Sequence, residues 1–178
     1  SNIRGITIDA GLAPFLGLGV YDNASNATIT GDVSSYADVT VRAGGNAVFA
    51  SGSTTTADDN ILVQTGDDII VQAGATVTSA NNPSVAPDPL DPFNGVGALQ
   101  LQAGGLANLL SVPFTPIASL IVDGTLNSNT GAIIASANAI DGLGGTFSGS
   151  SIALDITDAP GAGGTQDNDA GLLTANCV

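Results

Sequence analysis

The chain has 178 residues and a formal net charge of −14, because only two arginines face sixteen acidic residues, all of them aspartate. We do not expect a chain with so little positive charge to bind nucleic acid or an anionic membrane, since both require clustered lysine and arginine. Histidine and lysine are absent, which excludes Ser-His-Asp triads, lysine-containing phosphate loops and the usual zinc or haem ligand sets. The remaining partners are cations, neutral or basic surfaces, and other copies of the chain.

The composition favours β-structure. Glutamate, lysine and methionine, which are strong helix formers, are absent, whereas glycine, threonine, valine, isoleucine, asparagine and aspartate are abundant. A hydrophobic fraction of 43% is ample for a core, and this length predicts one domain over residues 1–178. Apolar runs such as residues 11–20 are short and interrupted by Pro14 and glycines, so no membrane insertion is expected.

A short pattern, apolar-x-apolar-x-Ala/Thr-Gly, recurs along the chain. Alternation sends the apolar side chains to one face and the polar ones to the other, and the closing glycine permits a sharp turn. Each copy is therefore predicted to be a short strand followed by a corner. The copies are ITIDAG (6–11), VTVRAG (39–44), ILVQTG (61–66), IIVQAG (69–74), LQLQAG (99–104) and a decayed copy, LIVDG (120–124).

The start-to-start spacings are 33, 22, 8, 30 and 21 residues, which indicates a coil of roughly 21 residues. The spacing of 8 is too short for a whole coil, so ILVQTG and IIVQAG are predicted to form two sides of one coil, joined at Gly66-Asp67-Asp68. The spacing of 30 exceeds the unit by about nine residues and contains "NNPSVAPDPLDPFNG", so residues 81–97 are predicted to form an inserted loop. A second loop, rich in glycine and aspartate, is predicted at 158–171.

Weaker strand candidates lie between these copies, and turn residues punctuate them. A parallel β-helix, also called a β-solenoid, explains the returning hexapeptide, because every coil must stack its apolar face on the next. A β-sandwich or jelly roll would give similar punctuation and is the alternative. The weaker candidates are residues 27–30, 47–50, 76–79, 132–135 and 151–157.

Four strings carry a resemblance to a known family: "DVTVRAGGNAVFASGSTT", "DDIIVQAGATVTSA", "GALQLQAGGLANLL" and "SLIVDGTLNSNTGAIIASANAI". They resemble the passenger repeats of filamentous-haemagglutinin-like exoproteins and, more loosely, those of autotransporter adhesins, over residues 27–157. The resemblance implies a right-handed parallel β-helix that is exported to the bacterial surface or beyond and acts in adhesion or biofilm formation. Nothing resembles the family's secretion domain or toxin tip, so we expect a stretch of stalk or a compact relative. The start at Ser1 fits a processed secreted protein or an excised fragment.

The strongest enzymatic signal is Gly66-Asp67-Asp68, because pectin-cleaving β-helix hydrolases use such a motif within an acid–base cluster of aspartates. Their companion motifs contain histidine and lysine, so we expect Asp67 and Asp68 to cap backbone amides at a corner instead. A polysaccharide lyase would need an arginine base, and only Arg4 and Arg42 exist; Arg42 is expected to be an outward surface residue. We therefore predict a non-catalytic protein without cofactor, with a polysaccharide-acting enzyme as the last alternative.

Calcium is the one metal ion that the composition favours, because it is coordinated by oxygen atoms of aspartate, asparagine and backbone carbonyls. Such residues crowd into two segments that match no EF-hand, and we expect them to be solubilising acidic loops, with calcium binding as the alternative. Cys177 has no partner in the chain and is expected to be a free terminal thiol or an intermolecular disulfide. The two acidic segments contain Asp88, Asp91 and Asn94, and Asp158, Asp167, Asn168 and Asp169.

The apolar segments near the two ends, "ITIDAGLAPFLGLGVY" (6–21) and "GLLTANCV" (171–178), predict either caps on their own coils or strands added to a neighbouring subunit. The second possibility makes a self-assembling subunit of an extracellular filament, pilus-like appendage or sheath the alternative function. In an adhesin, outward asparagine, threonine, serine and aspartate side chains are expected to contact host or surface glycans or proteins.

Overall fold

A computed structural model describes residues 5–15, 18–21, 25–80, 98–104, 118–142, 144–156 and 172–175. These residues contain nineteen β-strands and no helix, which confirms the predicted all-β class. The strands form four sheets, which we name A to D in the order of their first strands. Sheets A, C and D are parallel, whereas sheet B is an antiparallel hairpin of β2 (Leu12–Phe15) and β3 (Leu18–Tyr21).

The strands of each parallel sheet are stacked in chain order. Sheet A contains β1 (Gly5–Ala10), β6 (Asp38–Ala43), β9 (Ile61–Thr65), β12 (Leu99–Gln102), β15 (Ala132–Ala137) and β18 (Ser151–Ile156). Sheet C contains β4 (Ala27–Ile29), β7 (Ala47–Phe49), β10 (Ile69–Val71), β13 (Ser119–Val122) and β16 (Ala139–Asp141). Sheet D contains β5 (Asp32–Ser35), β8 (Thr54–Ala57), β11 (Thr76–Ser79), β14 (Thr125–Ser128), β17 (Thr146–Gly149) and β19 (Leu172–Ala175).

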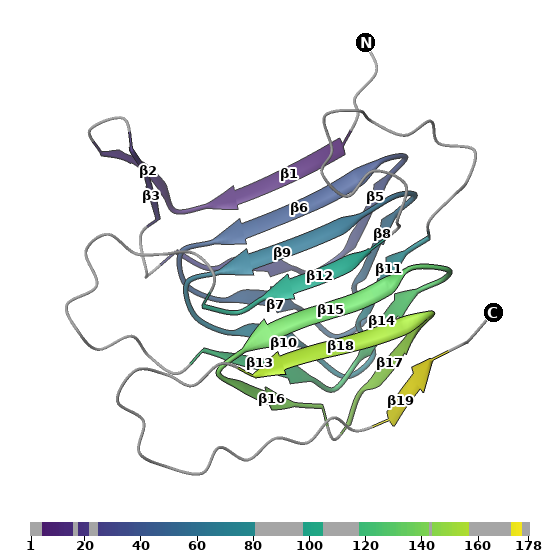
Figure 1. Cartoon of the computed structure of the whole chain (residues 1–178). Coiled ribbons are helices and arrows are strands. Elements are labelled where there is room, and N and C mark those ends of the chain that lie inside the picture. Colours follow the sequence, from purple (N-terminus) through teal and green to yellow (C-terminus); the bar gives the residue numbers. More distant parts are fainter. Residues whose placement is uncertain are drawn as a thin grey trace, which may run out of the picture.

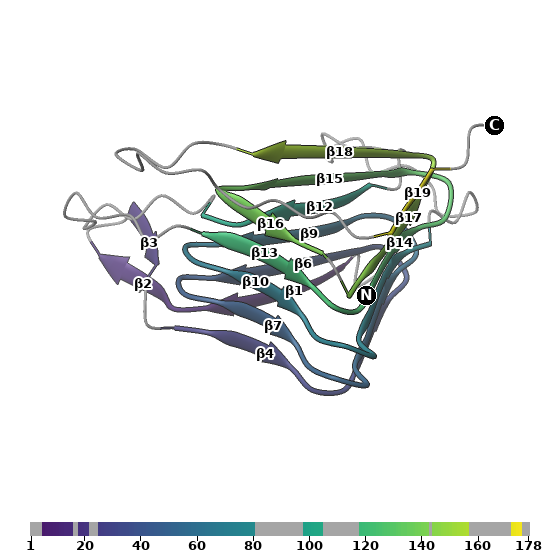
Figure 2. The ribbon, with the colours of Figure 1, turned by 90° about the horizontal axis from the view of Figure 1, so that it is seen from below.

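The chain visits the three sheets in rotation. From β6 in sheet A it passes to β7 in sheet C and β8 in sheet D, and β9, β10 and β11 then pair in parallel with those three strands. We call each such circuit a turn. Figures 1 and 2 show the three sheets around a common interior, with sheet B projecting beside β1. The arrangement is compatible with the predicted β-solenoid, and its parallel pairing differs from the antiparallel sheets of a sandwich.

The predicted unit length agrees with the pairing, although one spacing was misinterpreted. Register partners in successive turns lie 20 residues apart at Asn26 and Asn46, and 22 apart at Arg42 and Gln64. The repeats that start at residues 6, 39, 61 and 99 lie in sheet A strands, whereas those that start at 69 and 120 lie in sheet C. The spacings of 30 and 21 therefore compared strands of different sheets.

The predicted excess of about nine residues in one coil was consequently wrong. Gln64 and Gln102 occupy the same position in β9 and β12 and lie 38 residues apart, against 22 for the preceding turn. The Pro-rich segment 81–97 falls in this interval and lies outside the described residues, as does the predicted loop 158–171. The other prediction about this region is confirmed, since β9 and β10 are successive sides of one turn, joined at Gly66-Asp67-Asp68.

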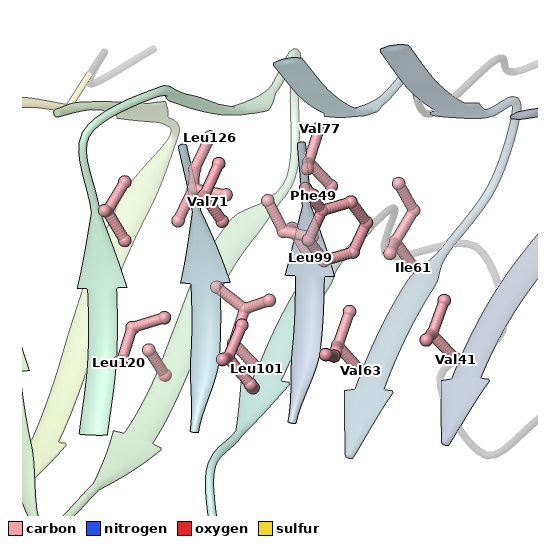
Figure 3. Packing of buried hydrophobic residues seen from close by; sticks show 14 of the residues in the cluster. Val41, Phe49, Ile61, Val63, Val71, Val77, Leu99, Leu101, Leu120 and Leu126 are labelled. Atoms are coloured by element: carbon pink, nitrogen blue, oxygen red, sulfur yellow. The ribbon is translucent and has the colours of Figure 1, made fainter. Parts of the chain in front are cut away.

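The core lies between the three sheets and is made by the inward member of each alternating pair. Its largest fully buried side chains come from all three sheets, and Figure 3 shows several of them meeting in the interior. Bulky and small residues share a turn: Phe49 lies with Ala47 on its own strand and with Ala57 in sheet D, and Phe147 lies with Ala135 in sheet A. Such pairing of large with small side chains keeps the interior close-packed. These largest side chains are Phe49, Phe147, Ile61, Ile69, Leu99, Leu101, Leu120, Leu126, Ile133, Ile140, Val39 and Val41.

Both apolar end segments contribute strands to sheet edges. β1 pairs only with β6 and is an outermost described strand of sheet A, and β19 pairs only with β17 and is an outermost described strand of sheet D. The five weaker strand candidates correspond to β4, β7, β11, β15 and β18, whereas β5, β8, β14, β16 and β17 and the hairpin were not predicted. Among the described residues, no helix has the length and apolar character needed to cross a membrane.

Candidate functional site

The corner that joins β9 to β10 lies directly on the corresponding corner of the preceding turn. The Gly66 amide donates to the Ala43 carbonyl at 2.9 Å, and the Asp67 amide donates to the Gly45 carbonyl at 3.3 Å. The Asp68 amide donates to Oδ1 of Asn46 at 3.0 Å. Every backbone amide of Gly66-Asp67-Asp68 therefore bonds to the turn before it.

The Asp68 carboxylate is bonded to the following turn. Its Oδ1 accepts a hydrogen bond from the Ser119 amide at 2.7 Å. Asn46 has the same arrangement one turn earlier, since its own amide donates to Oδ1 of Asn26 at 2.8 Å. We name Asn26, Asn46 and Asp68 the first Asx column. Each side chain in it accepts the amide of the next turn's register partner, so the column ties four turns together where the chain enters sheet C.

A second Asx column, Asp38 and Asn60, lies where the chain enters sheet A. Asp38 Oδ1 accepts hydrogen bonds from both the amide and Nδ2 of Asn60, each at 3.1 Å. Asn60 is buried, and its Oδ1 accepts the amide of buried Ala98 at 2.9 Å. A buried amide without an acceptor costs free energy. These side chains therefore stabilise the fold by accepting the amides of Asn60 and Ala98, which lie just before the sheet A strands.

Asp67 differs from Asp68 in its environment. Partial burial, and secondarily the negative charge of Asp68, raise the pKa of the Asp67 carboxyl above its ordinary value. The main chain at this residue is fixed, since its carbonyl accepts from Oγ1 of Thr65 at 2.6 Å and from the Gly104 amide at 3.2 Å. A raised carboxyl pKa is a property of general acids, although structural carboxyls show it too.

Acid–base hydrolysis of a glycoside needs two carboxyls that face the scissile bond. At this corner one of the two candidate carboxylates, that of Asp68, is hydrogen-bonded to a backbone amide of the protein itself. Within the described residues, no group of three or more His, Cys, Asp or Glu side chains lies close enough to hold a metal ion. The geometry thus supports amide capping as the role of Asp68, and the absence of catalysis stays a prediction.

Replacing Asp67 by asparagine is expected to stabilise the fold increasingly as pH rises. A raised folded-state pKa means that the folded protein binds the proton more tightly than the unfolded chain, so stability is greatest below the unfolded pKa and falls as pH rises through the folded pKa. Asp67→Asn removes that loss. Urea titrations at acid and neutral pH measure the free energy of unfolding, and the value for the variant relative to the wild type should increase with pH. Asp155 is exposed, so an equal increase for Asp155→Asn would contradict the assignment of the pKa shift to burial.

Replacing Asp68 by alanine is expected to lower the free energy of unfolding by about 1–3 kcal/mol, because the half-buried Ser119 amide loses its acceptor. Asp68→Asn keeps an Oδ1 acceptor, as Asn26 and Asn46 do in the same column, and should retain most of the stability. Urea denaturation followed by circular dichroism distinguishes the two variants. Equal stability of the alanine and asparagine variants would contradict the capping role.

Arg42 occupies the predicted outward position on sheet A. It is half-buried rather than fully solvated, and its Nε donates to Oε1 of Gln64 at 3.2 Å. Gln64 Nε2 in turn donates to Oε1 of Gln102 at 2.8 Å. Asp9 on β1 is the register partner of Arg42, so an acidic residue lies beside Arg42 on the neighbouring strand. The outward side chains of sheet A are therefore joined across turns, a further structural use of polar groups.

The remaining sequence candidates lie outside the described residues. These are Arg4, Cys177 and the two acidic segments that invited calcium, namely Asp88, Asp91 and Asn94, and Asp158, Asp167, Asn168 and Asp169. Calcium binding and the state of the thiol therefore stay predictions.

Sequence reasoning missed the Asx columns, although a signal exists. Asn-Ala precedes three sheet C strands, at Asn26, Asn46 and Asn138, and Asp68 takes the same place before β10. Asn138 Oδ1 accepts the Ala118 amide of the preceding turn at 3.0 Å, which reverses the direction used by the first Asx column. A search for asparagine one residue before each weak strand candidate would have found Asn26 and Asn46.

Comparison with known proteins adds no family to these observations. The chain matches no protein-family model, no curated protein sequence and no solved structure.

Proposed function

We propose that the chain is a non-catalytic adhesive scaffold, a right-handed parallel β-helix displayed at the bacterial surface or released outside the cell. The observation that carries the proposal is the use of polar side chains to hold turns together. Asp68, which the sequence marks as the best catalytic candidate, caps an amide of the next turn, and Asn60 and Gln64 also bond between turns. These bonds stabilise a stack of parallel strands with long outward faces available for contact.

Three further observations support an adhesin. The order in which the strands stack is the order expected of a solenoid, in which each turn contacts only its neighbours. The strings that resemble filamentous-haemagglutinin-like repeats, between residues 27 and 157, contain β6, β7, β10 to β15 and parts of β8 and β16. The acidic composition suits a soluble surface protein that does not associate with anionic lipid.

The proposal is tested by displaying the chain on a non-adherent bacterium and counting the cells retained under flow on glycan-coated, protein-coated and uncoated glass. We expect retention above that of cells displaying an unrelated soluble domain on at least one coated surface. Retention equal to the control on every surface would refute adhesion. An assay for release of reducing sugars from the same glycans distinguishes the polysaccharide-acting enzyme, since an adhesin releases none.

A second candidate function, subunit of an extracellular filament, has its own supporting observation. The outermost described strands of sheets A and D, including β1, β18, β5 and β19, each pair on one side only within the described part of the chain. Unpaired strand edges are templates for strand addition by another copy, and lysine, the usual residue that blocks such pairing, is absent.

Electron microscopy over a concentration series tests this candidate. Filaments of uniform width should form from the wild type and be suppressed by Thr7→Lys, which places a charge on the edge strand β1. Thr40→Lys is the matched control, because Thr40 is the register partner of Thr7 on the interior strand β6. Monomeric rods at every concentration would remove the filament candidate and leave the adhesin.

A further inference from the structure

The outer face of sheet D carries a two-row array of short polar side chains. One row is Thr54, Thr76, Thr125 and Thr146, which are register partners along β8, β11, β14 and β17. The second row is Thr56, Thr78, Asn127 and Ser148, two residues further along the same strands. The residues between the rows point inward and are fully buried, as Val77, Leu126 and Phe147 show. We name these eight outward residues the hydroxyl grid.

The hydroxyl grid repeats in two directions. Neighbouring strands of a sheet lie about 4.7–4.9 Å apart, and alternate residues of one parallel strand lie about 6.6 Å apart. Because all four strands pair in register, the side chains form aligned rows rather than a staggered set. Figure 1 shows β8, β11, β14 and β17 side by side. Threonine is stiff about χ1, so six of the eight positions present their methyl and hydroxyl groups in few orientations.

The grid is chemically unlike the outer face of sheet A. On sheet A, Arg42, Gln64 and Gln102 bond to one another across turns. Within the described part of the chain no hydrogen bond engages a threonine hydroxyl of the grid, and the only side-chain bond made from it joins Asn127 Nδ2 to Asn129 Oδ1 at 2.8 Å. These hydroxyls therefore remain available to an external partner.

Charge and shape limit what that partner is. None of the eight residues is charged, although the chain carries a net charge of −14. Apart from Asp32, the register partner of Thr54 on β5, the outer face of sheet D is uncharged, so it is complementary to an uncharged surface and not to a cation or a basic protein. No aromatic residue belongs to the grid, so it lacks a ring on which a sugar could stack. A hydroxyl is both donor and acceptor, as water is, and a repeated set of hydroxyls matches a partner with the same repeat.

We propose that the hydroxyl grid binds ice. Its two repeats are close to the oxygen–oxygen repeats on the faces of hexagonal ice, so the hydroxyls can join the hydrogen-bond lattice while the threonine methyls order the adjoining water. The rigid sheet loses little conformational freedom when it binds, which favours attachment to a flat crystal. This function goes beyond adhesion to glycans or proteins, and the purified chain tests it without cell display.

The test measures thermal hysteresis, ice-crystal shaping and inhibition of ice recrystallisation by the purified full chain. The wild type is expected to shape ice and to show hysteresis that rises with concentration. Thr76→Tyr, at the centre of the grid, should abolish both effects, because a large ring lifts the ice lattice off the neighbouring hydroxyls. Thr40→Tyr is the matched control, since Thr40 is likewise half-buried and outward-facing, but on sheet A, and it should keep full activity.

A second variant separates loss of binding from loss of folding. Thr76→Val keeps the shape of the side chain and replaces its hydroxyl by a methyl group, and circular dichroism tests whether each variant keeps its β-structure. A graded loss from Thr76→Val to Thr76→Tyr supports the proposal. Folded wild type without ice shaping or hysteresis would overturn it. So would equal loss in Thr40→Tyr, or sedimentation with crystalline cellulose or chitin that depends on Thr76 while ice growth is unaffected, because the grid would then be a glycan face.

Discussion

Replacement of Phe49 by alanine is expected to lower the free energy of unfolding by about 3–5 kcal/mol, the range for removing a large aromatic side chain from a packed core. Phe49 is fully buried on the inner face of sheet C, and its register partners are Ile29 and Val71 in the turns on either side. The other core residues of its turn include Ala47 and Ala57, which are too small to fill the space that the ring leaves.

Urea denaturation followed by circular dichroism measures this change, and Val48→Ala is the matched control. Val48 is adjacent on the same strand, but it points outward and is half-buried, so its truncation should cost much less. Similar losses in the two variants would mean that the interior between the three sheets is not packed as the structure has it. A typical domain has about 5–15 kcal/mol of stability in total, so the Phe49 variant is expected to unfold well below the wild-type midpoint.

Replacement of Gly66 by alanine is expected to destabilise the fold by about 1–3 kcal/mol or more, the cost of forcing extra volume into a packed site. A Cβ atom at Gly66 would overlap the backbone carbonyl oxygen of Gly44 in the preceding turn. Because that contact is with main chain, relief requires the two turns to separate, which strains the hydrogen bond from the Gly66 amide to the Ala43 carbonyl.

Gly31→Ala is the control for this substitution. A Cβ atom at Gly31 would meet nothing within 4 Å, so alanine there should be neutral or slightly stabilising through the unfolded state. Thermal unfolding followed by circular dichroism compares the two variants. Equal melting temperatures for Gly66→Ala and Gly31→Ala would show that successive turns do not approach as closely as the structure places them.

The sequence predicted the sheet A strands well because their signal is local. Val39 and Val41 alternate with Thr40 and Arg42, and both valines are fully buried in the structure. The same reasoning identified ILVQTG and IIVQAG as neighbouring sides of one turn, since eight residues cannot complete a circuit. It also assigned every closing glycine to a sharp turn. Gly74 and Gly104 do have positive φ angles, of 81° and 73°, but Gly66 is required by close approach of the backbone instead.

Most strands of sheet D were not predicted, because their inward and outward residues differ little in polarity. In β8, Thr54, Thr55 and Thr56 follow one another, and only the structure shows that Thr55 is fully buried while its neighbours face outward. The hydroxyl grid was invisible for the same reason, since it depends on which strands are neighbours. Residues such as Thr78 and Asn127 are 49 positions apart in the chain and become partners only through the pairing of β11 with β14.

The connections between the sheets show how this architecture can diversify. Asn26 and Asn46 are 20 residues apart and Asp68 and Ser119 are 51 apart, yet both pairs make the same bond between adjacent turns. In the chain, the longer interval includes residues 81–97, between sheets D and A, and residues 105–117, between sheets A and C. The entropic cost of closing a loop grows only slowly with its length, so a connection tolerates long insertions while the turns on either side keep their register. New segments can therefore be added or exchanged at these connections without repacking the interior.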